Sequence, residues 1–274
     1  RCWGSGTQGQ LGNGTSTNSS TPVAVTGITT AIAVSAGGSH TCALLADATV
    51  RCWGAGWNGQ MGNGTTTGIN TTPVTVTGIG TATAVSAGGS HTCATLADAT
   101  IRCWGWNYYG GLGDGTTTDR PTPVTVSGVT GATSVTAGHY HSCARLTDGT
   151  LRCWGYGGYG ALGDGSTTTQ TTRVTVTGIS TATDVAAGGT HTCARLADGT
   201  VRCWGSHTHG QVGDGVGHWG GTGFSRTTPV EVVGLTDAAS VAGGSRHTCA
   251  VRTDGSVRCW GSSGYGELGT GVDT

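Results

Sequence analysis

Residues 40–54, HTCALLADATVRCWG, are typical of two short strands joined by a tight turn. Apolar and β-branched residues lie on both sides of Asp47, which favours strands that flank the turn. Cys42 and Cys52 lie ten residues apart with Asp47 midway, so a hairpin centred on Asp47 places the two cysteines directly opposite each other. Opposed residues in such a ladder lie about 4.5–5.5 Å apart, which is within reach of a disulfide bond.

The turn of this hairpin occurs five times in the chain, and its third residue determines how strained the backbone is. A three-residue hairpin loop places its last residue in the left-handed region, which favours glycine. Gly149, Gly199 and Gly255 satisfy this requirement. Ala48 and Ala99 occupy the same position in the other two copies, where we expect mild strain.

The hairpin belongs to a repeat of about 50 residues that runs through the whole chain. The Arg-Cys-Trp-Gly motif begins at Arg1, Arg51, Arg102, Arg152, Arg202 and Arg258, and the His-Thr/Ser-Cys motif begins at His40, His91, His141, His191 and His247. The repeat units are about 1–50, 51–101, 102–151, 152–201, 202–257 and a partial unit 258–274. We therefore expect residues 1–274 to form one repeat domain of about 5.4 repeats, which starts and ends within a repeat. Because the sequence begins without Met, we expect a processed form or part of a longer protein.

Each repeat has the pattern of four short strands. In the first repeat they centre on Val34, on His40 to Leu45, on Val50 to Trp53, and on the alternating apolar residues that begin at Val23. Four strands in a unit of about 50 residues are typical of a β-propeller blade. A proline precedes the alternating strand at Pro22, Pro73, Pro123 and Pro229, which fits an outer edge strand. The sequence thus predicts an all-β propeller.

Ten of the eleven cysteines form pairs in the hairpin register. The pairs are Cys42 with Cys52, Cys93 with Cys103, Cys143 with Cys153, Cys193 with Cys203, and Cys249 with Cys259. Buried free thiols are the alternative, and a metal site is disfavoured because the short Cys-x₂₋₄-Cys spacing is missing. We predict five disulfides, which imply a secreted, cell-surface or periplasmic location. By the same register the partner of Cys2 would precede Arg1.

Composition excludes several classes of protein. The 54 glycines among 274 residues have no period of three, so the chain is not collagen-like. Net charge is −1, and all thirteen basic residues are arginines without a basic stripe, so we expect no nucleic-acid partner. No apolar stretch approaches the roughly 20 residues of a membrane-spanning helix.

The repeat resembles that of the regulator of chromosome condensation family. The resemblance rests on Cys-Trp-Gly, Gly-Gln-Leu-Gly-Asn-Gly-Thr, Pro-Val-x-Val, Ala-Gly-Gly-x-His-Thr-Cys-Ala and Asp-Gly-x-Val, which residues 1–54 show nearly whole and which recur along the chain. It implies a β-propeller, usually of seven blades. The paired cysteines and Thr-rich linkers resemble a secreted bacterial branch. The eukaryotic founder is a nucleotide-exchange factor, but nothing here matches its basic tail or an exchange-factor insertion, so that activity is not expected to carry over.

Residues that recur in every repeat are expected to be structural. A catalytic residue is needed once, so we expect the repeated His to hydrogen-bond the backbone near the blade core and the repeated Trp to pack between blades. The Gly-Asn-Gly and Gly-Asp-Gly runs supply too few oxygens for calcium and favour turns. No motif places a nucleophile beside a base and an orienting acid, so we expect neither an enzyme nor a cofactor.

The loop that follows each Cys-Trp-Gly varies between repeats and is rich in aromatic residues. A constant framework with variable aromatic loops on one face favours a recognition surface, the alternative being drift in exposed loops. The fifth repeat also carries an insertion, residues 216–226. The candidate binding residues are Trp57, Trp106, Tyr108, Tyr109, Tyr156, Tyr159, His207, His209, His218, Trp219 and Tyr265. A metal site formed by His207, His209 and His218 is a less favoured alternative, and we predict none.

These observations predict a secreted or cell-surface propeller that binds a protein or a glycan, or assembles with copies of itself, through the aromatic loops. Two alternatives stay open at this point. One is an intracellular regulator of the nucleotide-exchange type, which free thiols would support. The other is a protein inhibitor that caps the active site of an enzyme with one loop face.

Overall fold

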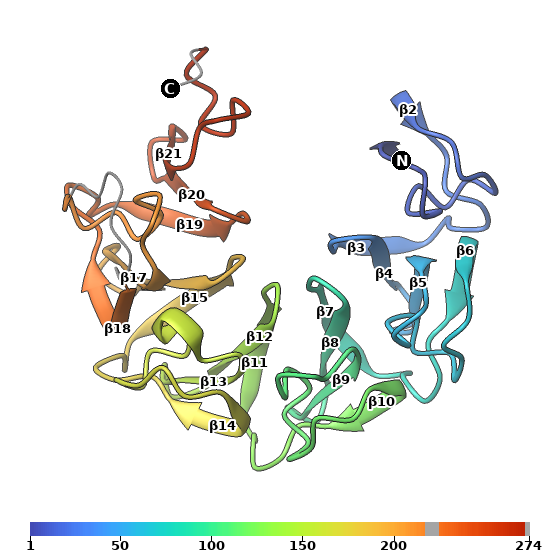
Figure 1. The fold of residues 1–274 in the computed structure, drawn as a ribbon, viewed down its shortest axis with the longest axis horizontal. Helices are drawn as coiled ribbons and strands as arrows, with labels where there is room; N and C mark the ends of the chain where they lie inside the picture. Colours follow the sequence, from blue (N-terminus) through green and yellow to red (C-terminus); the bar gives the residue numbers. More distant parts are fainter. Residues whose placement is uncertain (217–224, 272–274) are drawn as a thin grey trace. The chain divides into compact units, whose positions relative to one another are not determined.

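The computed structural model describes residues 1–216 and 225–271, and in these ranges the fold is all-β (Figure 1). Apart from the short 3-10 turn η1 (Gly158–Gly160), every regular element there is a strand. Within each sheet, strands that follow one another in sequence lie side by side and pair antiparallel, which is the meander of a propeller blade. The predicted β-propeller of four-stranded blades is thus confirmed. The chain divides into two compact units, residues 1–135 and 136–274, which we describe separately.

Unit 1 contains a two-stranded sheet, β1-β2, and two four-stranded sheets, β3-β4-β5-β6 and β7-β8-β9-β10. The strands are β1 (Cys2–Gly4), β2 (Ser19–Val23), β3 (Ala31–Ala36), β4 (His40–Leu45), β5 (Val50–Ala55), β6 (Ile69–Thr75), β7 (Ala82–Ala87), β8 (His91–Leu96), β9 (Ile101–Gly105) and β10 (Arg120–Thr125). The prolines predicted at an outer edge lie in β2, β6 and β10, each the last strand of its sheet.

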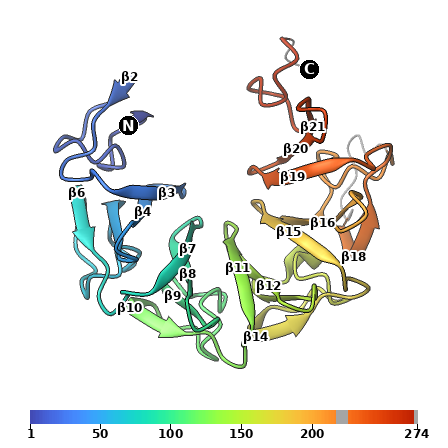
Figure 2. The ribbon, with the colours of Figure 1, turned by 180° about the vertical axis from the view of Figure 1, so that it is seen from behind.

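Unit 2 follows the same plan, with sheets β11-β12-β13-β14, β15-β16-β17-β18 and β19-β20-β21, seen from behind in Figure 2. The first strand, β11, spans the boundary at residue 135. The strands are β11 (Ala132–Ala137), β12 (His141–Leu146), β13 (Leu151–Gly155), β14 (Gln170–Thr175), β15 (Ala182–Ala187), β16 (His191–Leu196), β17 (Val201–Ser206), β18 (Ser225–Glu231), β19 (Ala238–Gly243), β20 (His247–Arg252) and β21 (Val257–Gly261).

The hairpins have the predicted register. Cys42 pairs with Cys52 across β4 and β5, and Cys193 pairs with Cys203 across β16 and β17. Each of the five predicted pairs is joined by a disulfide, with Cα atoms 4.0–4.1 Å apart. The only free cysteine in residues 1–216 and 225–271 is Cys2. The prediction of five cross-strand disulfides is confirmed.

The core lies between successive sheets within a unit. In unit 1, Trp104 belongs to one buried cluster with Cys42, Cys52 and Met61, and its Nε1 donates to the carbonyl of Gln60 at 3.0 Å. In unit 2, Trp204 belongs to the equivalent buried cluster, together with Cys143, Cys153 and Leu162 of the preceding sheet. The repeated Trp therefore packs between blades, as expected from its recurrence.

The hairpin turn is held by its aspartate. Asp47 Oδ1 accepts hydrogen bonds from the amide of Thr49 at 3.0 Å and from its hydroxyl at 2.6 Å. The residue between them, Ala48, has φ of 62°, and Ala99 has φ of 61° in the next repeat. The glycines at this position have φ of 75–84°. Both alanines are therefore in the left-handed region expected from the sequence.

We expect Ala48→Gly and Ala99→Gly each to raise the free energy of unfolding by about 0.5–1 kcal/mol, because glycine avoids the left-handed Cβ clash at some cost in chain entropy. Urea titration measures the change. The matched control is Gly255→Ala, whose Cβ would meet no atom within 4 Å, so that only the backbone conformation is tested. A destabilising effect of Ala48→Gly would contradict the assignment of strain.

Candidate binding site

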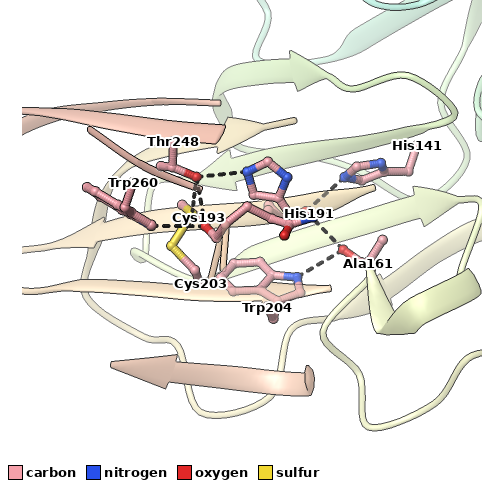
Figure 3. Close-up of a disulfide and its surroundings, with 10 residues drawn as sticks. His141, Ala161, His191, Cys193, Cys203, Trp204, Thr248 and Trp260 are labelled. Atoms are coloured by element: carbon pink, nitrogen blue, oxygen red, sulfur yellow. Dashed lines mark hydrogen bonds between the residues drawn. A yellow bond between two sulfur atoms is a disulfide. The ribbon is translucent and has the colours of Figure 1, made fainter. Parts of the chain in front are cut away.

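A hydrogen-bond network joins neighbouring sheets at the base of the variable loops, and Figure 3 shows it around Ala161. In unit 2 the carbonyl of Ala161 accepts hydrogen bonds from Trp204 Nε1 and from Thr192 Oγ1, each at 2.9 Å. The carbonyl of Gln211 accepts the same pair of bonds from Trp260 and Thr248, at 3.0 and 2.9 Å. At Gln10, Gln60, Ala161 and Gln211, one backbone carbonyl thus accepts hydrogen bonds from a Thr and a Trp of the following sheet.

The repeated histidine completes this network through a threonine. His191 Nε2 lies 2.8 Å from Thr248 Oγ1, and His40 Nε2 lies 2.9 Å from Thr92 Oγ1. Because Thr248 donates its only hydroxyl hydrogen to the Gln211 carbonyl, His191 Nε2 must carry the proton that it donates to Thr248. The histidine therefore acts on the backbone through a hydroxyl, whereas the sequence pointed to a direct bond.

Burial keeps these histidines neutral. Loss of hydration, with a smaller contribution from a neighbouring histidine, lowers the pKa of His40 to about 3 and the pKa of His191 to about 4. Their Nδ1 atoms are buried and have no hydrogen-bond partner in the part of the chain that the structure describes. Both rings serve as neutral donors in the framework.

Side chains of the loops then fold back on this framework. Gln211 Oε1 accepts the amide of His209 at 2.8 Å, and Gln60 Oε1 accepts the amide of Asn58 at 2.9 Å. Gln10 Oε1 accepts the amide of Gln8 in the same way, so the loops of the first, second and fifth repeats share this base. Variation in sequence is therefore concentrated at positions whose backbone is fixed.

Four of the candidate aromatic residues are exposed at these tips. The exposed fractions of the side chains are 50% for Trp57, 66% for Tyr108, 47% for Tyr159 and 94% for Tyr265. In unit 1, Tyr108 stacks on Trp106 with ring centroids 6.0 Å apart, and Tyr109 meets both rings edge-on at 5.0 and 5.5 Å. Trp106 and Tyr109 are partly buried, as is Tyr156 in unit 2.

The two candidate histidines of the fifth repeat have different surroundings. His209 is exposed, and its Nδ1 lies 2.9 Å from Thr208 Oγ1. His207 is buried, and its Nε2 lies 3.0 Å from Asp214 Oδ1, so it is not on the loop surface. Burial opposes ionisation of Asp214, but hydrogen bonds led by that from Arg226 outweigh it and hold the pKa of this carboxyl below its usual range. His218 and Trp219 lie outside the described residues.

A polar pocket of about 370 Å³ lies in unit 2 and brings several loops together. We call it the unit 2 pocket. Its lining includes His139, Tyr140, Tyr159, Thr190, His209 and Arg246. Tyr159 and His209 were predicted from the sequence.

His139, Tyr140 and Arg246 were not predicted as site residues, although the sequence contains a signal for them. The two residues before the repeated histidine are Gly-Ser, Gly-Ser, His-Tyr, Gly-Thr and Ser-Arg in the five repeats. The bulky exceptions lie in the third and fifth repeats, and both line the unit 2 pocket.

The described ranges contain no group of three or more His, Cys, Asp or Glu side chains placed to hold a metal ion. In the same ranges no helix has the length and apolar character needed to cross a membrane.

Comparisons with known proteins agree with the fold. Human WBSCR16 matches with a TM-score of 0.73 and 20% identity over 84% of this chain and 62% of its own, so this chain spans less than two thirds of that protein. Prp20p from Saccharomyces cerevisiae matches with a TM-score of 0.68 and 20% identity over 99% of this chain and 82% of its own. The ectodomain of the Physcomitrella patens receptor kinase CR4 matches with a TM-score of 0.53 and 24% identity over 85% of this chain and 50% of its own.

No curated protein sequence matches the chain significantly. The family described as RCC1-like domain, in contrast, matches residues 1–274. This match covers the same repeats whose motifs indicated the resemblance. The chain belongs to the RCC1-like domain family.

Proposed function

We propose that this protein is a non-enzymatic binding propeller that works outside the cell or at a cell surface. It recognises a protein or glycan partner through its variable loops. The observation that carries the proposal is the exposure of Trp57 and Tyr108 at the third position of the variable loop, and of Tyr159 and Tyr265 at the fourth. Aromatic side chains on rigid loops offer large contact area at a low cost in conformational entropy.

Two further observations support this function. Five disulfides suit an oxidising compartment, because cytosolic thiols are kept reduced. Protein binding is also recorded for structural neighbours, since one yeast RCC1 structure contains Kap60 and the Prp20p structure is described with binding to Gsp1p and histones. At 19–20% identity these partners belong to those proteins, and the support for this chain is that the fold can bind proteins through its surface.

The test compares a loop variant with a framework variant. The loop variant carries Trp57→Ser, Tyr108→Ser and Tyr265→Ser, and leaves Tyr159 intact. The control carries Val233→Ser, which replaces an equally exposed apolar residue outside the loops. Both proteins, with the unmodified protein, are applied in the oxidised state to a glycan array and to a panel of purified extracellular proteins.

We expect at least one ligand that the unmodified protein and the control bind equally and that the loop variant binds at least tenfold more weakly. Loss of several aromatic contacts of about 1–2 kcal/mol each accounts for this factor. Equal binding by the loop variant would contradict the proposed role of the loops. Turnover of a ligand on the array would contradict the non-enzymatic assignment.

A further inference from the structure

The unit 2 pocket is built from loops that are already fixed to one another. The loops β11–β12, β15–β16 and β19–β20 are joined in series by backbone hydrogen bonds. His139 N donates to Gly188 O at 3.2 Å, and Gly189 N donates to Gly244 O at 3.1 Å. A Cβ at Gly189 would lie 2.4 Å from Ser245 O, so only glycine permits this approach. The pocket is therefore preorganised, and a ligand would not have to order these loops.

The charge of the pocket comes from one arginine. Arg246 is exposed, and in residues 1–216 and 225–271 its guanidinium has no hydrogen bond or ion pair. Arg120, Arg226 and Arg252 are different, because each pairs with an aspartate. No carboxylate is among the residues that line the pocket in the described ranges. A free guanidinium in a site without acidic residues favours an oxyanion ligand, and a carboxylate can accept two parallel hydrogen bonds from it.

The remaining lining consists of aromatic rings and neutral polar groups. Tyr159 is half exposed, Thr190, Thr208 and Ser245 supply hydroxyl groups to the lining, and Thr208 Oγ1 lies 2.9 Å from His209 Nδ1. No Leu, Ile, Val, Met or Phe lines the pocket among the described residues. A ring face surrounded by hydroxyl partners suits a sugar, whereas an acidic peptide would find no aliphatic surface for its neighbouring side chains.

Tyr159 also has a backbone conformation that its equivalents lack. Its φ of 60° is in the left-handed region, while Asn58, Tyr109 and His209 at the same loop position do not have positive φ. Such a conformation costs about 1–2 kcal/mol in a non-glycine residue. Retained backbone strain is concentrated at functional sites, and here it places an aromatic ring in the pocket wall.

We infer that the unit 2 pocket binds a saccharide unit that carries a carboxylate, such as a hexuronic acid. Arg246 pairs with the carboxylate, Tyr159 packs against the sugar ring, and the threonine and serine hydroxyls bind sugar hydroxyls. The volume of about 370 Å³ is at the lower end of the range of about 300–1,000 Å³ for small-ligand pockets, which suits one or two sugar units. This inference rests on the proposed binding function and narrows its ligand.

The experiment is an NMR titration of the oxidised protein with methyl glucuronide and, as the matched neutral sugar, methyl glucoside. The ring signals of His139 and His209 report occupancy of the pocket. We expect saturable shifts at millimolar glucuronide, and affinity for the glucoside at least fivefold lower. Arg246→Gln removes this preference, while Arg258→Gln, at an exposed arginine outside the pocket, retains it.

The Tyr159→Gly variant distinguishes a loss of sugar binding from a loss of the folded structure. Glycine removes the ring and relieves the strained φ, so we expect weaker binding of both sugars in a protein of equal or greater thermal stability. Absence of shifts with either sugar overturns the inference. Shifts caused by N-acetyl-aspartate methylamide but not by glucuronide also overturn it, in favour of an acidic peptide. Neither result alters the outcome of the loop-variant test, which leaves the pocket residues intact and reports separately on the proposed function.

Discussion

Reduction of the five disulfides is expected to unfold the protein at room temperature. Each bond closes a loop with a sequence separation of 10, for which chain entropy gives about 2.5–3 kcal/mol. The sum is about 13 kcal/mol, and the whole stability of a folded domain is only about 5–15 kcal/mol. Far-UV circular dichroism and the fluorescence of the buried tryptophans would follow the transition as reductant is added.

The state of the cysteines provides the control for this result. Alkylation before reduction is expected to label Cys2 alone, and alkylation after reduction all eleven cysteines. A Cys2→Ser variant is expected to unfold at the same concentration of reductant as the unmodified protein. A fully reduced and alkylated protein with native tryptophan fluorescence would contradict the prediction and would favour the intracellular alternative.

Acidification is expected to destabilise the protein between pH 6.5 and about pH 4. The pKa of His40 is about 3 and that of His191 about 4 in the folded state, against 6.5 when unfolded. In this window the unfolded chain binds more protons than the folded one, so stability falls as the pH falls and is fully retained above pH 6.5. Each histidine contributes about 1.4 kcal/mol per pH unit, so these two lower the free energy of unfolding by about 4 kcal/mol from pH 7 to pH 5.

Urea titrations at pH 7, 6 and 5 measure this effect. His191→Gln is expected to lower the slope of the free energy of unfolding against pH by the amount that corresponds to about one proton. The reason is that glutamine can donate to Thr248 without titrating. His139→Gln is expected to change this slope less than His191→Gln, because burial lowers the pKa of His139 but its ring stays partly exposed. Hydrogen bonds from Thr49 lower the pKa of Asp47, so its stabilising effect is lost only below about pH 4, outside this window. A slope that His191→Gln does not change would contradict the prediction.

The hairpins could be predicted from the sequence because all their determinants are local. The spacing of Cys42 and Cys52 about Asp47 specifies register, and register specifies the disulfide. The partner of His191 could not be predicted in the same way. Thr248 lies 57 residues further on, in the next repeat, and its identity depends on how two sheets pack.

The loops show a second limit of sequence reasoning. His207 and His209 have the same side chain and are two residues apart, but one is buried against Asp214 and the other is exposed. The direction of each side chain follows from the loop backbone, which is fixed by the hydrogen bonds to the carbonyl of Gln211. Asn107 occupies the position of His207 in the third repeat and is also buried, with Leu112 N donating to its Oδ1 at 3.0 Å. Residue type alone did not distinguish these inner positions from the outer ones.

The loop carbonyl that accepts two hydrogen bonds from the following sheet determines which changes such proteins tolerate. It is a main-chain group, supplied by glutamine at Gln211 and by alanine at Ala161, so the coupling does not depend on the side chain at that site. Stability in such arrays is close to a sum of nearest-neighbour contributions. We therefore expect that the loop tips of one repeat can replace those of another without loss of stability. A deletion is expected to be tolerated only when it removes a whole repeat. The groups that join the sheets are thus separate from the side chains exposed at the loop tips. This separation makes the fold suitable for combinatorial libraries of new binding surfaces.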